Sequence, residues 1–306
     1  MSAFNRGLGL VLRFIRRLPG GSQSILAEAS DGRIYVVKFA NNLQGANLPF
    51  NESMGSEIYR ALELPTPAWR PLVVTNDFLD RNPDCWMEGE AGTIRPSPGL
   101  CFGSRFLGGK GVQLHEILPE SGLKRINNRD AFWMAWLVDI CADHADNRQA
   151  VFVESGRGGL KAFFVDHGHL FGGPKAEQGP KFLASRYLDF RIYRGVSSEY
   201  LLNLQKALAG ADLDRLWKRM RTLPEGWKTV SAVNRFAQCL ERLATPKLLG
   251  NIVDTMFSAY ERSDGFERNG CQHEQEVMCS ILRPGLPAAG PGGNADSDRT
   301  NHAVCA

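Results

Sequence analysis

The segment CADHADNRQAVF, residues 141–152, places Asp143, His144, Asp146, Asn147 and Gln149 between two apolar runs. Side chains of these types support three interpretations. They can ligate a transition metal in a hydrolase, because imidazole and carboxylate are common ligands of such metals. They can form the catalytic loop of a phosphoryl-transfer enzyme. They can also cap a turn and carry no chemistry.

A second acidic site follows in KAFFVDHGHLFGG, where Asp166 ends an apolar run. An acid at the end of a buried strand can project into a cleft and bind Mg²⁺ that bridges nucleotide phosphates. The runs QAVFVE and KAFFV, separated by SGRGG, predict a β-hairpin between the two acidic sites. Acids on both sides of a short hairpin are typical of the catalytic and metal loops of kinases.

A lysine and a glutamate in the N-terminal third of the chain suit the same chemistry. Lys38 ends the run YVVK, on the alternation that is expected to bury Val36, and Glu52 opens the next helical segment. A carboxylate that fixes a flexible ammonium group beside phosphates makes a nucleotide clamp. The alternative is an ordinary solvated lysine at a strand end.

The metal-hydrolase interpretation uses the histidines instead. His144, His167 and His169 would be the ligands, together with Asp143 or Asp166. This arrangement leaves Lys38, Glu52 and the N-terminal strands without a role. Each histidine taken alone is more often a turn or core residue than a ligand.

The elements that must position these residues change character near residue 112. Residues 9–39 predict strands, with GGSQ as one turn and Asp31-Gly32 as a hairpin turn. NESMGSEIYRALEL predicts one helix, capped by Asn51 and ended by PTP. WRPLVV and GLCFGSRFL predict returning strands. Residues 1–112 are therefore expected to form a small antiparallel sheet with one helix.

Beyond Gln113 the pattern becomes helical. NRDAFWMAWLVDICADH is apolar on most sides, which predicts a buried helix. Two later segments, at 197–223 and 232–261, also carry helical spacing. We expect residues 113–263 to form a mostly helical unit around the hairpin. Residues 264–306, rich in glycine and proline, are expected to be disordered, because they cannot bury enough surface to offset their ordering entropy.

Composition narrows the class of protein. With 306 residues and 43% apolar content, the chain can bury a large core in two domains or lobes. Its 36 basic and 33 acidic residues are interspersed, which gives no strong nucleic-acid signal. Seven cysteines without a CxxC pair favour free thiols and a cytoplasmic location. No window approaches the ~20 apolar residues of a membrane span.

Several motifs together resemble the HipA-like kinase domains, in a stand-alone form. They are LPGGSQSILAEASDGRIYVVKF, NESMGSEIYRALELPTP, CFGSRFLGG, DNRQAVF and FFVDHGHLFGG, and the resemblance covers residues 10 to 260. It implies an α+β, two-lobed protein-kinase-like fold with a β-rich N-lobe and a helical C-lobe. It also implies transfer of phosphate from ATP, with Mg²⁺, to a hydroxyl of a protein substrate, the chain itself included.

The resemblance assigns roles to single residues. Lys38 would meet the nucleotide phosphates, Glu52 would be its helix partner, Asp146 the catalytic base and Asp166 the metal-binding acid. The phosphate-covering turn would be Gly20, Gly21, Ser22 and Gln23, and Phe102 would lie near the adenine.

The chain also departs from the family's pattern. The family carries a metal-binding asparagine a few residues after the base, whereas here Gln149 is the candidate, with the same amide oxygen one methylene further out. Asp143 is a rival for the base, and DHG replaces the DFG of ordinary kinases. The alternative to an active kinase is therefore a non-catalytic nucleotide-binding pseudokinase.

Overall fold

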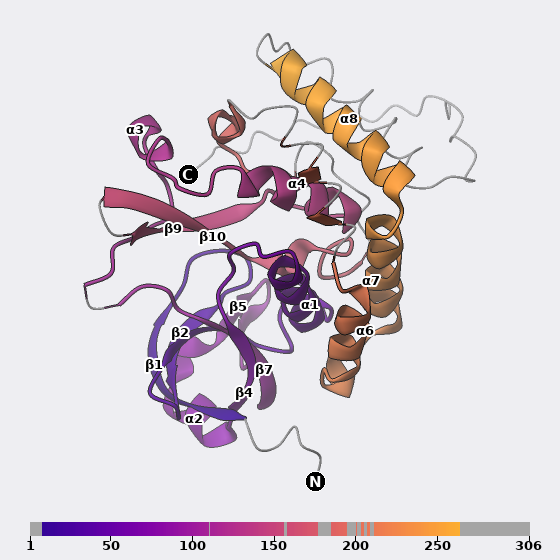
Figure 1. Ribbon diagram of the computed structural model, residues 1–306. Coiled ribbons are helices and arrows are strands. Elements are labelled where there is room, and N and C mark those ends of the chain that lie inside the picture. Colours follow the sequence, from indigo (N-terminus) through magenta and orange to yellow (C-terminus); the bar gives the residue numbers. More distant parts are fainter. Residues whose placement is uncertain are drawn as a thin grey trace, which may run out of the picture.

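The computed structural model describes residues 8–263, apart from 110, 156–157, 177–184, 195–199, 201–202, 205–206 and 209–210. Within these residues a β-barrel formed by the N-terminal part adjoins a mostly helical part formed by the rest (Figure 1). The expected tail at 264–306 and part of the helical segment expected at 197–223 lie outside the described residues.

The N-terminal strands form a closed barrel. Its strands are β1 (Gly9–Arg17), β2 (Ile25–Ala29), β3 (Ile34–Lys38), β4 (Trp69–Val74) and β7 (Gly99–Arg105), in the order β1-β2-β3-β7-β4. Neighbours are antiparallel except β1 and β4, which pair in parallel through Gly9 with Leu72 and Leu10 with Val73. The expectation of an antiparallel sheet was therefore wrong for this one pair of strands. Closure leaves no sheet edge unpaired.

The predicted hairpin turn is confirmed, with Gly32 at φ +70° between β2 and β3. Tyr35 and Val37 point into the barrel core. Val36 is only half-buried, and Lys38 shares its face because side chains alternate along a strand. That face is covered by α1, so Lys38 is 6% exposed and is not a solvated strand-end lysine.

Helix α1 (Leu48–Ala61) begins earlier than expected. Pro49 lies in its first turn, where a proline costs no hydrogen bond, and Asn47 occupies the N-cap position. Asn51 is therefore inside the helix and does not cap it. Further elements were not predicted at all: α2 (Asn76–Arg81), the short helix η2 (Pro83–Cys85), and the hairpin of β5 (Met87–Gly89) with β6 (Gly92–Ile94).

The predicted second hairpin is confirmed as β9 (Gln149–Ser155) with β10 (Gly159–Val165), and β8 (Leu114–His115) adds a short third strand. The buried helix is α4 (Ala131–Cys141), in which every residue from Phe132 to Cys141 is buried. The last predicted helical segment, at 232–261, consists of two helices, α7 (Val230–Leu243) and α8 (Pro246–Ser263). They are separate because Pro246 starts a new helix. The others are α3 (Glu120–Leu123), η4 (His167–His169), η5 (Phe190–Tyr193), α6 (Leu213–Arg221) and η6 (Glu225–Trp227).

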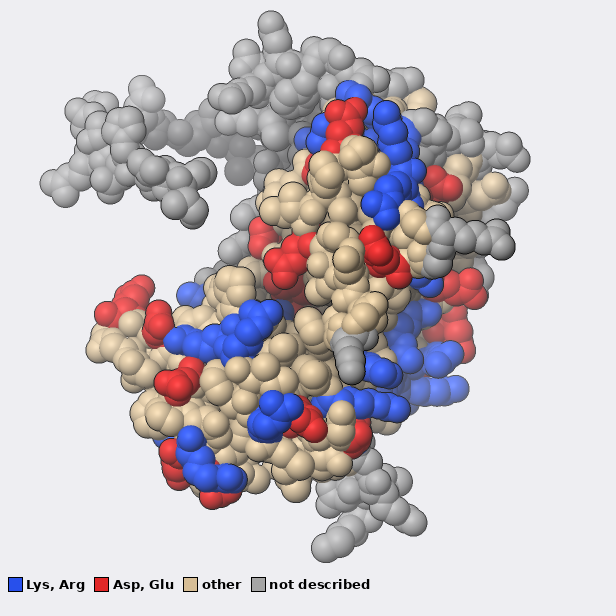
Figure 2. Space-filling view, turned by 90° about the vertical axis from the view of Figure 1, so that its left-hand side faces the viewer, with Lys and Arg blue, Asp and Glu red and all other residues tan. Residues whose placement is uncertain are grey.

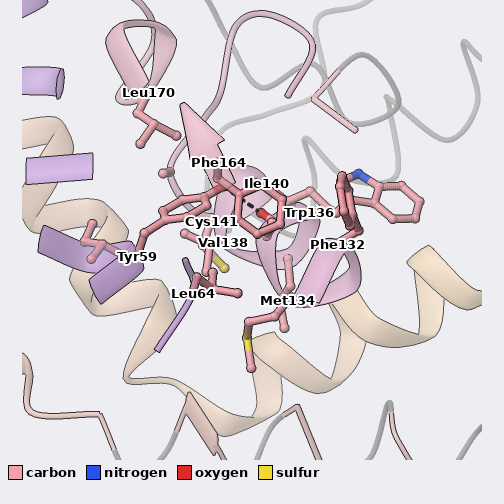
Figure 3. Packing of buried hydrophobic residues seen from close by; sticks show 14 of the residues in the cluster. Tyr59, Leu64, Phe132, Met134, Trp136, Val138, Ile140, Cys141, Phe164 and Leu170 are labelled. Carbon is pink, nitrogen blue, oxygen red and sulfur yellow. Dashed lines mark hydrogen bonds between the residues drawn. The ribbon is translucent and has the colours of Figure 1, made fainter. Parts of the chain in front are cut away.

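One hydrophobic core joins α1, the second hairpin and α4. Figure 3 shows Tyr59 of α1 beside Phe164 of β10, with side chains of α4 packed against them. The rings of Tyr59 and Phe164 lie 5.5 Å apart edge to face, and Phe132 of α4 is 4.9 Å from Phe164. Each such buried side chain contributes about 1.5–3 kcal/mol of apolar burial. The core thus fixes α1 relative to β10, the strand that precedes Asp166.

The charges on the surface are mixed. On the face shown in Figure 2, basic and acidic side chains lie near one another in both the upper and the lower parts of the molecule. No helix among the described residues has the length and apolar character needed to cross a membrane.

Candidate active site

Lys38 connects three elements that are far apart in the sequence. Its ammonium donates to Oε1 of Glu52 on α1 and, at 2.7 Å, to Oδ1 of Asp166 after β10. Lys38 and Glu52 are almost completely buried, and the Asp166 side chain is 23% exposed. Lys38 is thus in direct contact with its expected helix partner, Glu52, and with the expected metal-binding acid, Asp166.

The charges of this triad follow from burial and mutual attraction. Burial disfavours the Lys38 cation, but Asp166 and Glu52 outweigh it and raise the pKa of Lys38. Burial also opposes ionisation of Asp166, yet Lys38, with help from Glu52 and His169, lowers its pKa well below the usual range. Burial raises the pKa of Glu52, and Lys38 opposes that shift. At neutral pH the triad therefore holds a lysine cation beside an ionised Asp166.

Asp166 has the left-handed backbone conformation, with φ +57°. This conformation costs a non-glycine residue roughly 1–2 kcal/mol, so neighbouring bonds must maintain it. On one side Arg148 Nη1 donates to the carbonyl of Val165 at 3.0 Å. On the other, Glu52 accepts from the amides of His167 and Gly168 at 3.2 and 3.0 Å. Glu52 therefore fixes the backbone after Asp166 as well as the lysine.

Asn51 fixes the same loop from α1, a role that the sequence analysis missed. Its buried amide nitrogen lies within hydrogen-bond distance of the carbonyls of Gly168, Leu170 and Gly173, at 2.9, 2.8 and 3.2 Å. The signal in the sequence was an amide beside Glu52 within an apolar helix, where a buried polar group needs partners.

Helix α1 and the turn η4 approach each other at two glycines. A Cβ added to Gly55 would lie 2.5 Å from Cβ of His167, and one added to Gly168 would lie 2.4 Å from Cδ1 of Leu48. Neither position has room for a side chain. Together with Asn51 and Glu52, these glycines make α1 and the Asp166 loop one tightly packed unit.

A buried network lies behind the loop. The guanidinium of Arg148 donates twice to Asp139, each time at 2.7 Å, and stacks over the ring of Tyr59 at 5.0 Å. Nδ1 of His167 lies 3.3 Å from Arg148 Nη1, and its Nε2 lies 3.0 Å from Oγ1 of Thr66. Burial lowers the pKa of His167 well below its ordinary value, so this histidine is neutral. Both its nitrogens are engaged, which removes it from the expected set of metal ligands.

The two candidates for the base have different surroundings. Asp143 is 2% exposed, with Oδ2 at 3.2 Å from Arg235 Nη1 and Oδ1 at 2.9 Å from Arg242 Nη1. The Asp146 side chain is 43% exposed, and its Oδ1 accepts from the amide of Asn147 at 2.8 Å. A base must reach its substrate, so the exposure of Asp146 suits that role better than the enclosure of Asp143.

His169, the third histidine, lies beside Asp146. Its Nε2 is 4.0 Å from Oδ2 of Asp146 and 3.4 Å from Nε2 of Gln44, which belongs to the loop between β3 and α1. His144 is fully buried, bonds through Nδ1 to the carbonyl of Asp146, and has a pKa well below the ordinary value because of burial. Among the described residues, no three His, Cys, Asp or Glu side chains form a metal-binding group. The structure thus gives the histidine-based hydrolase no support.

The glycine turn, residues 20–23, lies against the loop between β3 and α1. Asn42 donates to the carbonyl of Ser22 at 2.7 Å, and a Cβ added to Gly21 would lie 2.9 Å from Nε2 of Gln44. The backbone at position 20 has φ +111°, a conformation that favours the glycine found there. The side chain of Gln23 points elsewhere, since it exchanges two hydrogen bonds with the backbone of Glu88. The role of Gln23 in the phosphate-covering turn stays a prediction, and its side chain is engaged by Glu88.

Two more expectations concern single residues. Phe102 is 1% exposed and its ring stacks on Trp69 at 5.6 Å, so it belongs to the core and offers no surface to an adenine. Gln149 is exposed at the start of β9, where it pairs with Val165, the residue before Asp166. No hydrogen bond joins the Gln149 side chain to Asp166 among the described residues, and its metal-binding role stays a prediction.

No family model matches the sequence, and no curated protein sequence matches it significantly. Among solved structures, hydra Fam20 with sugar is similar at a TM-score of 0.50 and 11% identity, over 84% of this chain and 88% of that chain. Golgi casein kinase gives a TM-score of 0.44 at 11% identity, over 81% and 74% of the two chains. Its Mn/ADP-bound structure gives 0.43 at 10%, over 81% and 73%. The similarity to Fam20 shows a mixed α/β, protein-kinase-like fold.

Proposed function

We propose that this protein is an ATP- and Mg²⁺-dependent phosphotransferase that acts on a hydroxyl group. The observation that carries the proposal is the buried Lys38 ammonium held between Glu52 and Asp166. A cation fixed in this way is suited to the phosphates of a nucleotide. The protein-kinase-like fold is consistent with that use. Catalysis would then consist mostly of positioning and charge compensation.

In this reaction Lys38 binds the phosphates and Glu52 keeps its ammonium in place. Asp146, partly exposed, takes the proton of the acceptor hydroxyl. The acceptor oxygen forms a bond to the terminal phosphorus as the bond to the bridging oxygen breaks, and ADP leaves. The oxygen ligands present suit a hard cation, and Asp166 with Gln149 would hold it. Bound Mg²⁺ supplies neutralisation of charge on the phosphate oxygens.

The resemblance to HipA-like kinases supports a serine or threonine of a protein, the chain itself included, as the acceptor. The motifs for the phosphates, the base and the metal occur in that family's order along the chain. In the described part of the chain Cys85, Cys101, Cys141 and Cys239 are free and buried, which suits a reducing, cytoplasmic location.

The proposal is tested by a thermal-shift titration with Mg-ATP beside mass spectrometry of the intact protein. A ligand at 100 times its Kd stabilises the folded state by about 2.7 kcal/mol, which raises the melting temperature measurably. We expect stabilisation and incorporation of phosphate in the wild type, and loss of phosphate incorporation in Asp166→Asn. Asp77→Asn, an exposed acid on α2, is the matched control and should behave as wild type.

Two outcomes would contradict the proposal in different ways. Stabilisation by Mg-ATP without phosphate in the protein or in an added protein substrate would favour the pseudokinase. If no nucleotide stabilises the protein, the proposal of a phosphotransferase is overturned.

A further inference from the structure

We propose that Arg235 of α7 is a positioning residue that fixes the base, Asp146, relative to the metal-binding acid, Asp166. Its side chain joins the base loop, residues 142–146, to the segment 169–176 that follows Asp166. The inference rests on the proposed function and adds to it a residue that no sequence motif assigns to phosphate, base or metal.

The first support is the pair of hydrogen bonds that Arg235 makes. Its Nη1 donates to Oδ2 of Asp143 at 3.2 Å, and its Nη2 donates to the carbonyl of Ala176 at 3.3 Å. Asp143 lies in the base loop, and Ala176 lies at the end of the segment that follows Asp166. The two arms of a guanidinium form a rigid, planar fork, so they set the separation of the two groups that they bind. One side chain of α7 therefore ties the base loop to the segment 169–176.

The second support is that the backbones of the same two stretches are bonded to each other. Three hydrogen bonds connect them, from the amide of Phe171 to the carbonyl of Ala142, from Gly172 to Asp143 and from Ala145 to His169, at 2.6, 3.0 and 2.9 Å. Asp146 directly follows the last of these residues in the base loop, and Asp166 comes shortly before the first of them in the other stretch. Any shift between the two stretches therefore moves the base relative to the metal-binding acid.

The third support is the backbone conformation of three residues in these stretches. Asp143, Phe171 and Ala176 are left-handed, with φ values of +49°, +57° and +56°. None of them is a glycine, so each conformation costs free energy and must be maintained by its surroundings. Arg235 binds the side chain of the first and the carbonyl of the last. The arginine thus stabilises a conformation that the local backbone preferences do not favour.

A second arginine of α7 does not replace this bridge. Nη1 of Arg242 lies 2.9 Å from Oδ1 of Asp143, but the same nitrogen donates to the carbonyl of Cys141 at 2.8 Å. Oδ1 of Asp143 has no hydrogen-bond partner among the described residues. Both contacts of Arg242 are with the base loop and the end of α4, so they do not hold the segment 169–176. That connection comes from Arg235.

The phosphate-binding residues are held independently of the bridge. Glu52 of α1 binds the ammonium of Lys38, and both Glu52 and Asn51 bond the backbone of the Asp166 loop. Loss of the bridge should therefore displace the base while a nucleotide still binds. Because the reacting atoms must be aligned, a displacement of about 1 Å lowers the rate of transfer by roughly 100-fold.

The test uses the full chain with Arg235→Lys and Arg235→Met. The rate of phosphate incorporation at saturating Mg-ATP is measured by mass spectrometry of the intact protein. The Kd of Mg-AMP-PNP, a non-hydrolysable triphosphate, is measured by isothermal titration calorimetry. Lysine keeps a cation beside Asp143, but a single ammonium cannot bind both groups at the spacing of the fork. We expect both variants to incorporate phosphate at least about tenfold more slowly, with the Kd within about twofold of the wild type.

Hydrogen exchange resolved to single amides gives a second readout, which does not depend on turnover. In Arg235→Lys the amides of Phe171 and Gly172 should exchange at least about tenfold faster, because their bonds to the base loop open more often. The amides of His167 and Gly168, which are bonded to α1, should keep their wild-type rates.

Arg215→Lys, at an exposed position on α6, is the matched control and should behave as the wild type in all three measurements. An unchanged rate of transfer in Arg235→Lys, or unchanged exchange of Phe171 and Gly172, would overturn the inference. An equal loss of rate and of nucleotide affinity would overturn it too, because a general structural role produces that result. If the wild type transfers no phosphate, the proposed function fails, and the positioning role fails with it.

Discussion

At the scale of single residues, the chemistry of this site depends on what burial does to charge. Lys38 is almost fully enclosed and is neutralised by two carboxylates. Removing one partner of a buried ion pair leaves the other charge unpaired, which costs about 3–5 kcal/mol. We therefore expect Lys38→Met to lower the free energy of unfolding by that amount in urea denaturation.

The double variant Lys38→Met/Glu52→Gln is the control for this prediction. It removes a cation and an anion together, so it should be more stable than Lys38→Met alone. A Lys38→Met protein as stable as the wild type would show that the two carboxylates are not held close to the ammonium.

The two neighbouring aspartates should separate function from stability. Asp143 is enclosed with Arg235 and Arg242, so Asp143→Asn should cost about 3–5 kcal/mol of stability in urea denaturation. Asp146 is partly exposed, and Asp146→Asn should leave the unfolding curve within about 0.5 kcal/mol while abolishing phosphate transfer. The assignment of the base would be reversed if Asp143→Asn kept its stability and lost turnover.

At the scale of elements, α1 and the Asp166 loop pack as one unit. Gly55 and Gly168 let their backbones approach so closely that neither position has room for a side chain. In Gly55→Ala the new methyl group would lie 2.5 Å from Cβ of His167, an atom fixed by the backbone. The loop must then move, and Asp166 moves with it. We expect at least about a tenfold loss in affinity for Mg-AMP-PNP, measured by calorimetry.

Gly226→Ala is the matched control, since an added Cβ there meets nothing within 4 Å. It should bind Mg-AMP-PNP as the wild type does. Wild-type affinity in Gly55→Ala would show that the loop can be displaced without disturbing the phosphate site.

The elements that the sequence predicted are those with local signals. The Asp31-Gly32 turn, the hairpin of β9 and β10 and the apolar helix α4 each follow from a short stretch of residues. Closure of the barrel by β1 and β4 depends on a parallel pairing of residues far apart in the chain, for which the sequence has no local pattern.

The same distinction separates the site residues. Lys38, Glu52 and Asp166, which the structure brings together, could be selected from the sequence because each stands at the end or start of an apolar or helical segment. The role of Asn51 was missed, since its partners lie far from it along the chain. The burial of Phe102 does not favour its assignment to the adenine, because its strand pairs with that of Lys38 but its ring stacks on Trp69 in the core.

At the scale of the whole molecule, two buried neutral histidines link stability to pH. Burial lowers the pKa of His144 and His167 well below the ordinary value. Below about pH 6.5 the unfolded histidines bind protons and the folded ones do not, so stability falls as the pH decreases. Each histidine should contribute a slope of about 1.4 kcal/mol per pH unit, measured by urea denaturation at pH 7.5, 6.5 and 5.5.

His144→Gln should reduce this slope, and His115→Gln, a change at a half-buried position outside this network, should not. Asp166 affects stability at a lower pH than the histidines do. Folding lowers its pKa, so its contribution to the free energy of unfolding is present above about pH 3.8 and is lost as the pH falls below that value. A stability that does not change between pH 7.5 and 5.5 would mean that the two histidines become protonated in the folded protein.

The central claim is that Lys38 meets the phosphates of a nucleotide, and an acyl-phosphate derivative of ATP tests it most directly. This reagent transfers its acyl group to a lysine amine at the phosphate site, and peptide mass spectrometry then locates the modified lysine. We expect acylation of Lys38, protection by Mg-ATP, and no such protection in Asp166→Asn. Labelling of other lysines while Lys38 stays unmodified, or labelling of Lys38 that Mg-ATP does not reduce, would contradict the account.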